Sequence, residues 1–150
     1  ILGMPFRGVV TCGQLLHEKN ILYGEALIEA SELESTLAIY PRIIVLDRVF
    51  TELRKYPMDM ERLLDIETAE GNDYIRPDFD GICFLDFLRI NFQPQIVKNT
   101  REMIERMLET AKDDPKIVGK ARWLANYFNT TIQLFPDCGF SEIETGMLLY

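Results

Sequence analysis

The feature that most constrains this chain is the order of its apolar runs between residues 6 and 56. Phe6–Cys12 and Arg42–Asp47 are short, β-branched runs that suit buried strands. Between them, a helical pattern follows Gly24, with apolar residues recurring every three or four positions. A second helical run, 47–56, follows, and Asp47 is placed to cap it. A strand, a helix, a strand and a helix in this order predict an α/β (α+β) fold.

The rest of the chain divides into extended and helical parts. We expect extended runs at 14–17 and 21–23, turns at 70–73 and 77–81, and an apolar strand at 82–88 that completes a hairpin. A 3.6-residue period runs from Pro94 to Lys112, Pro115 breaks the chain, and a second helical pattern continues to Ile132. This helical hairpin packs either on the sheet or on a partner chain. We therefore predict a first domain over 1–92 and a helical extension over 93–150.

The helix after Gly24 is rich in carboxylates. Leu27, Leu33 and Leu37 fall on one face and are expected against the sheet. Four glutamates lie elsewhere on the helix, namely Glu25, Glu29, Glu32 and Glu34. Glu25, Glu29 and Glu32 share a second, acidic face of the helix. An acidic helix face is often solvated, and Glu near a helix N-terminus also suits the helix dipole.

Composition and net charge argue against some classes of function. The 150 residues are 47% hydrophobic and carry a net charge of −8, which argues against a non-specific nucleic-acid or membrane surface. No apolar run is long enough to span a membrane, and no signal peptide opens the chain. Three cysteines without metal-binding spacing, Cys12, Cys83 and Cys138, indicate reduced thiols in a cytoplasmic protein. The apolar start at Ile1 indicates a segment of a longer protein.

No single sequence motif in this chain identifies a functional site. The glycines match neither a dinucleotide-binding loop nor a P-loop. His17, the one histidine, is either a general base or a hairpin-edge residue. Asp78 and Asp80 before Gly81 are similar to the start of a calcium loop, but later ligands are missing, which favours a solvated turn.

Order and spacing together resemble the C-terminal half of a class III nucleotidyl cyclase domain. "RGVVTCG" at 7–13, "GEALIEASELESTLA" at 24–38 and "PRIIVLDRVF" at 41–50 carry the resemblance. The sequence of these segments is most similar to bacterial pyrimidine cyclases of anti-phage systems, which make cyclic CMP or cyclic UMP. The resemblance covers about fifty residues well, and the terminal helices are an addition to it.

The resemblance implies a ferredoxin-like cyclase sandwich that works as a head-to-tail homodimer. It also implies a nucleoside triphosphate substrate and two Mg²⁺ or Mn²⁺ ions. The metal-binding aspartates of the family would lie upstream of Ile1, so no metal ligand is expected in this segment. Candidate phosphate-binding residues are Arg7, Arg42 and Arg76, since arginine makes bidentate contacts.

Three positions depart from the family pattern. The Asn and Arg that the family offers to the ribose and the transition-state phosphate are Ile28 and Glu32 here. A charge pair about 4 Å apart is worth on the order of 4 kcal/mol at an effective dielectric near 20, so an inward Glu32 would oppose a triphosphate strongly. Glu32 is therefore turned aside, paired with a basic residue, or in contact with the nucleobase rather than a phosphate. Ile21 stands where purine cyclases carry a base-reading residue and makes no side-chain hydrogen bond.

The departures leave several functions open. One is a divergent cyclase that converts UTP or CTP to a 3′,5′-cyclic nucleotide, a phosphorus–oxygen lyase active as the full-length dimer. Another is a catalytically degenerate module that binds nucleotide or regulates a partner. An unrelated α/β domain and a structural protein that dimerises through its terminal helices are further alternatives.

Overall fold

The computed structural model describes residues 6–55, 74–111 and 114–145. They form an α+β fold, as predicted. The chain divides into two compact units, one from Phe6 to Phe87 and one from Leu88 onward. The boundary predicted from the sequence, between residues 92 and 93, falls inside the second of these units.

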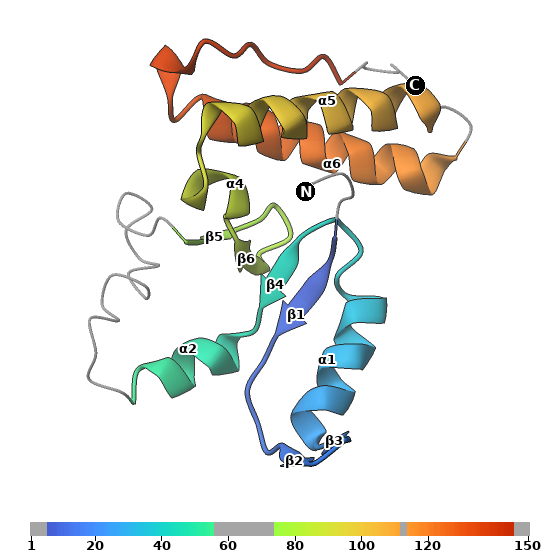
Figure 1. Ribbon diagram of the computed structural model, residues 1–150, viewed down its shortest axis with the longest axis vertical. Helices are drawn as coiled ribbons and strands as arrows, with labels where there is room; N and C mark the ends of the chain where they lie inside the picture. The colour runs from blue at the N-terminus through green and yellow to red at the C-terminus, as the bar shows by residue number, and fades with distance from the viewer. Residues whose placement is uncertain (1–5, 56–73, 112–113, 146–150) are drawn as a thin grey trace. The chain divides into compact units, whose positions relative to one another are not determined.

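The first unit is built on a four-stranded mixed sheet with the order β1-β4-β6-β5. Its strands are β1 (Gly8–Val10), β4 (Ile43–Val45), β6 (Cys83–Leu85) and β5 (Ile75–Pro77). β1 pairs with β4 in parallel, whereas β6 runs antiparallel to β4 and to β5 (Figure 1). A parallel pair needs a crossover connection, and here the crossover contains a hairpin and a helix.

The crossover begins with a separate two-stranded antiparallel sheet, β2 (Leu16–Glu18) and β3 (Ile21–Tyr23). All six of its residues are exposed. α1 (Glu25–Thr36) follows at once and lies beside β1 (Figure 1). Leu33 and Leu37 are partly buried, but Leu27 is 40% exposed, so the prediction that Leu27 packs on the sheet is wrong. Leu27 lies about 120° from Leu33 around the helix at 100° per residue, too far for one sheet to cover both.

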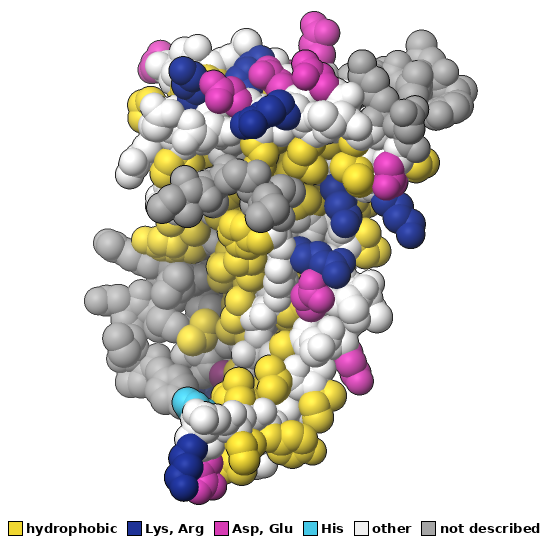
Figure 2. Space-filling view, turned by 45° about the vertical axis from the view of Figure 1, so that its right-hand side comes forward, with side chains coloured by type: hydrophobic (Ala, Val, Ile, Leu, Met, Phe, Trp, Pro, Cys, Tyr) yellow, Lys and Arg dark blue, Asp and Glu magenta, His cyan; other side chains and the backbone are white. Residues whose placement is uncertain are grey.

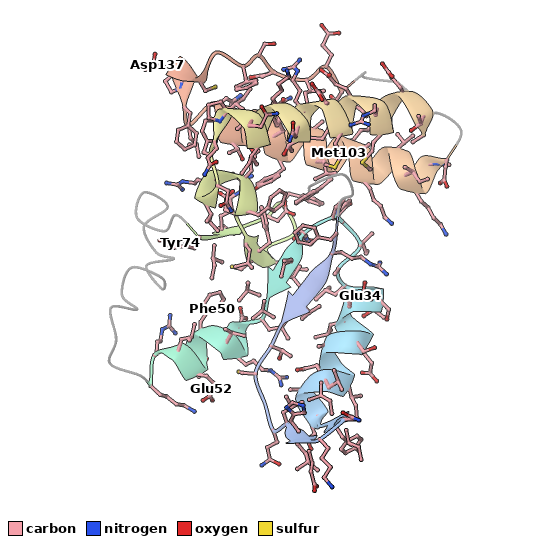
Figure 3. All side chains as sticks on the ribbon, in the orientation of Figure 1. Glu34, Phe50, Glu52, Tyr74, Met103 and Asp137 are labelled. Carbon is pink, nitrogen blue, oxygen red and sulfur yellow. The ribbon has the colours of Figure 1, made fainter. Side chains whose placement is uncertain are left out.

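After β4, the chain forms α2 (Asp47–Leu53). Asp47 is the first helical residue and Leu46 is the N-cap, without a side-chain capping bond; the predicted cap at Asp47 is one residue out. Phe50 and Glu52, both labelled in Figure 3, show the two sides of this helix. Phe50 is buried with Val45, Val49 and Ile75 in the core of the unit, whereas Glu52 forms an ion pair with exposed Lys55.

The hairpin of β5 and β6 is confirmed, and its turn lies at the predicted 77–81. The backbone N–H of Gly81 donates to Asp78 O, and Gly81 has a φ of +78°, a conformation that glycine adopts without strain. β6 is shorter than the predicted 82–88 strand, because α4 (Phe87–Ile90) begins after Asp86. The predicted turn at 70–73 lies outside the described residues.

The second unit is a helical hairpin, as predicted. α5 (Pro94–Thr110) and α6 (Pro115–Ile132) pack against each other (Figure 1). Asp114 caps α6 by accepting hydrogen bonds from the N–H groups of Lys116 and Ile117. A short 3₁₀ helix, η1 (Pro136–Cys138), follows. In the described ranges, no helix has both the length and the apolar character needed to cross a membrane.

Candidate functional site

The structure separates the four carboxylates of α1 into two kinds. Glu29 and Glu34 form ion pairs with arginines from other elements. Glu25 and Glu32 are exposed, and Ile28 beside them is 46% exposed. Residue 28 lies one helical turn from residue 25 and one turn from residue 32, so the three share a face. The two family positions, Ile28 and Glu32, therefore face away from the sheet of their own unit.

Glu29 is the centre of a small network at the edge of that face. The Thr11 hydroxyl, just after β1, donates to Glu29 Oε2 at 2.9 Å. Arg48 of α2 binds Glu29 Oε1 through Nη2. The Arg48 side chain is 50% exposed and that of Glu29 is 26% exposed. β1, α1 and α2 thus meet in one partly solvated network, which holds an arginine against α1.

Arg7 belongs to a different part of α1. Its Nε lies 2.5 Å from Glu34 Oε1, and both side chains are 38% exposed. Glu34, labelled in Figure 3, is near the end of the helix. At 100° per residue, it lies about 140° around the helix from Glu29. Arg7 therefore does not reach the Glu29 side of α1.

Gly24 explains why α1 begins where it does. Its carbonyl accepts hydrogen bonds from the N–H groups of Leu27 and Ile28, at 3.1 and 3.2 Å. A Cβ at residue 24 would lie 2.3 Å from Gln14 O and 2.9 Å from Leu15 Cα. Both are backbone atoms before β2, so only glycine lets the hairpin and the helix start approach this closely.

An exposed apolar surface surrounds the start of α1. Figure 2 shows apolar side chains gathered at the end of the unit that holds β2, β3 and the first turn of α1. Ile21, the predicted base-contacting residue, is 65% exposed and belongs to this surface. The residues of this apolar tip, each at least 40% exposed, are Leu15, Leu16, Ile21, Leu22, Tyr23, Leu27 and Ile28. Contiguous exposed apolar residues of this kind mark interaction surfaces.

Arg42 lies in a closed cluster of its own. Its side chain is fully buried, and its guanidinium binds the carboxylates of Asp78 and Asp80. The Tyr40 ring lies under it, 5.5 Å from Cζ, and Phe79 meets Tyr40 edge-on with centroids 5.6 Å apart. A phosphate could reach Arg42 only if both carboxylates moved away. The turn predicted at Asp78 and Asp80 is present and largely exposed, and its two carboxylates also serve as counterions for the buried cation.

This cluster changes the protonation of its members. The hydrogen bond from Arg42 holds the pKa of Asp80 below its ordinary value. Burial lowers the pKa of Arg42, but its hydrogen bonds and the charges of the two aspartates outweigh that effect and raise it. Both shifts favour the charged pair.

Arg76, the third predicted phosphate residue, is also engaged. Its Nε is 3.7 Å from Asp86 Oδ2, and its guanidinium carbon is 5.3 Å from the centre of the Phe84 ring. The Arg76 side chain is 26% exposed, whereas that of Asp86 is 1% exposed. The three predicted arginines are thus held by three different sets of carboxylates, and they do not gather at one place.

The remaining candidates stay separate. His17 is exposed on β2, opposite Leu22, as a hairpin-edge residue would be. The three cysteines are partly buried free thiols, and burial raises the pKa of Cys83. Within residues 6–55, 74–111 and 114–145, no group of three or more His, Cys, Asp or Glu side chains is placed to hold a metal ion.

Sequence reasoning missed Arg48. It stands next to the predicted cap Asp47, and only the parallel pairing of β1 with β4 brings it to Glu29.

Comparisons of the chain with protein-family models, curated proteins and solved structures found no match.

Proposed function

We propose that this chain is part of a nucleotidyl cyclase that converts UTP or CTP to a 3′,5′-cyclic nucleotide and pyrophosphate. In this proposal the enzyme works as a cytoplasmic homodimer, and the cyclic nucleotide is a second messenger in anti-phage defence. α1 is the helix that faces the nucleotide. Within the apolar tip, Ile21 and Ile28 face the nucleotide and the other residues contact the partner subunit.

The observation that carries the proposal is the direction of the outer face of α1. Ala30 and Leu33, on the side of α1 opposite Ile28, are partly buried, while Ile28, Glu32 and the rest of the apolar tip are exposed. A helix that served only the core of its own unit would expose polar side chains on that face. An outer face with both isoleucine and glutamate suits a contact with a base and with a second chain better than it suits water alone.

The proposed chemistry is attack of the ribose 3′-oxygen on the α-phosphate, with loss of pyrophosphate and of the hydroxyl proton. Mn²⁺ or Mg²⁺ would supply charge neutralisation on the triphosphate, with ligands from outside this segment. Among the described residues, no group of three or more His, Cys, Asp or Glu side chains could hold that ion. This chain would contribute the surface that orients the nucleotide: Ile21 and Ile28 pack on the base, and Glu32 lies beside it.

A second candidate rests on the same two residues. Ile28 makes no hydrogen bond to a ribose, and Glu32 repels a phosphate. Both facts favour a degenerate cyclase-like module that binds a nucleotide, or a partner, without turnover.

Incubation of the full-length protein with Mn²⁺ and each of the four nucleoside triphosphates separates the two candidates. The cyclase proposal expects a 3′,5′-cyclic pyrimidine nucleotide and pyrophosphate by mass spectrometry. The binding-module proposal expects a nucleotide-dependent rise in unfolding temperature with unchanged triphosphate. Neither product nor thermal response would reject both.

A further inference from the structure

We infer that Arg48 is the phosphate-binding cation of the proposed nucleotide site, and that Glu29 positions it. The inference deepens the proposed function and rests on it. The exposed face of α1 lacks the positive charge that a triphosphate requires. Glu25 and Glu32 make this face acidic, whereas a triphosphate with its high negative charge needs cations within hydrogen-bonding distance.

Position distinguishes Arg48 from the other paired arginines of the first unit. Arg42 is enclosed by Asp78 and Asp80, and Arg7 is held at Glu34, on another side of α1. Arg76, 26% exposed, is held at Asp86 on the β5–β6 hairpin. Arg48 is held at Glu29, the residue that directly follows Ile28 and precedes Glu32 by one turn. It thus supplies positive charge at the edge of the outer face of α1.

Exposure and geometry also suit this role. The Arg48 side chain is 50% exposed, compared with 38% for Arg7 and none for Arg42. Its contact to Glu29 uses Nη2, and a guanidinium has five N–H donors in a rigid fork. The hydrogen bond from Thr11 fixes the second oxygen of Glu29. The guanidinium is therefore oriented before a ligand arrives, which lowers the entropic cost of binding a phosphate.

Two variants separate phosphate binding from simple structural support. Arg48→Ala and Glu29→Gln both break the same ion pair, but only Glu29→Gln keeps the guanidinium. The experiment has two readouts on the full-length protein. One is cyclic nucleotide formation, and the other is the rise in unfolding temperature that Mn²⁺ with UTP or CTP produces. Lys55→Ala is the control, because Lys55 forms a comparable exposed ion pair with Glu52 at 2.6 Å in the same unit.

Arg48→Ala is expected to lower kcat/KM by about 10- to 100-fold and to remove most of the nucleotide-induced thermal shift. Glu29→Gln is expected to lower kcat/KM by about three- to fivefold and to keep part of the thermal shift, because the guanidinium remains but the carboxylate no longer orients it. Lys55→Ala should match the wild type. Equal losses in Arg48→Ala and Glu29→Gln, or no loss in Arg48→Ala, would overturn the inference.

The outcomes also separate this inference from the proposed function. If nucleotide stabilises a wild-type protein that makes no product, and Arg48→Ala abolishes that stabilisation, the cyclase proposal fails and the assignment of Arg48 stands. If the wild type makes product and Arg48→Ala makes as much, the assignment fails alone. A wild type with neither product nor thermal response rejects both.

Discussion

At the scale of the residue, Arg42 joins two distant segments of the first unit. It is fully buried, and its charge is balanced by Asp78 and Asp80, which belong to a turn 36 and 38 residues later in the chain. A buried cation without its counterions is strongly destabilising, and so are carboxylates that lose a buried cation. The cluster therefore fixes the β5–β6 turn to the start of β4.

Replacing Arg42 with methionine tests this dependence. We expect a loss of about 3–5 kcal/mol in the free energy of unfolding, because two partly buried carboxylates remain without their cation. Urea titration measures the loss. The triple variant R42M/D78N/D80N should recover much of it, and Lys55→Met should stay within about 0.5 kcal/mol of the wild type, as exposed ion pairs do. An R42M protein as stable as the Lys55 variant would show that the cluster is not structural.

The same cluster predicts a dependence of stability on pH. The pKa of Asp80 is lowered in the folded state by its hydrogen bond to Arg42. A lowered carboxyl pKa stabilises the fold fully above the ordinary value of 3.8 and loses that effect as the pH falls through the folded-state pKa. The free energy of unfolding should therefore decrease as the pH falls below that value. Asp80→Asn should give a shallower decrease; an unchanged pH profile in Asp80→Asn would contradict the assignment.

At the scale of the element, the join between β3 and α1 sets the direction of α1. A Cβ on Gly24 would meet backbone atoms of Gln14 and Leu15, so a side chain there must shift either the hairpin or the helix start. In contrast, Gly119 lies within α6, where a Cβ would meet nothing within 4 Å.

The same substitution should therefore have opposite effects at these two glycines. Gly24→Ala is expected to destabilise the protein by about 1–3 kcal/mol, because backbone must move to admit the methyl group. Gly119→Ala should stabilise it by about 0.5–1 kcal/mol, since alanine is the better helix former. Thermal unfolding followed by circular dichroism measures both. Two changes of the same sign would mean that the contact of Gly24 with the chain before β2 is not a constraint.

At the scale of the whole molecule, the apolar tip is expected to mediate self-association. β2 and β3 form a two-stranded sheet with all residues exposed, and such a hairpin is marginally stable by itself. Burial of its apolar side chains against a second copy would stabilise both the hairpin and the dimer.

Leu16 and Tyr23, which are cross-strand neighbours in this hairpin, test the proposed dimer. The double variant Leu16→Ser and Tyr23→Ser should raise the dimer dissociation constant by about 100-fold or more, because two large apolar side chains no longer leave water. Sedimentation velocity of the full-length protein measures it, with Leu134→Ser, at a residue 51% exposed in the second unit, as the control. Equal affinity in the two variants would place the dimer contact elsewhere.

Local pattern was enough for much of the fold. Apolar periodicity and β-branched runs predicted β4, α1, α5, α6 and the β5–β6 hairpin, because burial of one face demands that spacing. Pattern failed at element ends. Leu88 lies in α4 rather than in the predicted strand: the N–H of Asp86 still bonds to Tyr74 O of the hairpin, and α4 begins at the next residue.

Residue types and their order along the chain determined the α+β class, the helical hairpin and the acidic helix. Only the tertiary structure decided which charges meet: Arg42 with Asp78 and Asp80, Arg48 with Glu29, and Arg7 with Glu34. Each of these pairs joins residues at least 19 positions apart, and no local spacing encodes such a contact. The physical reason is that burial selects faces locally, whereas ion pairs depend on strand order and on the packing of whole elements.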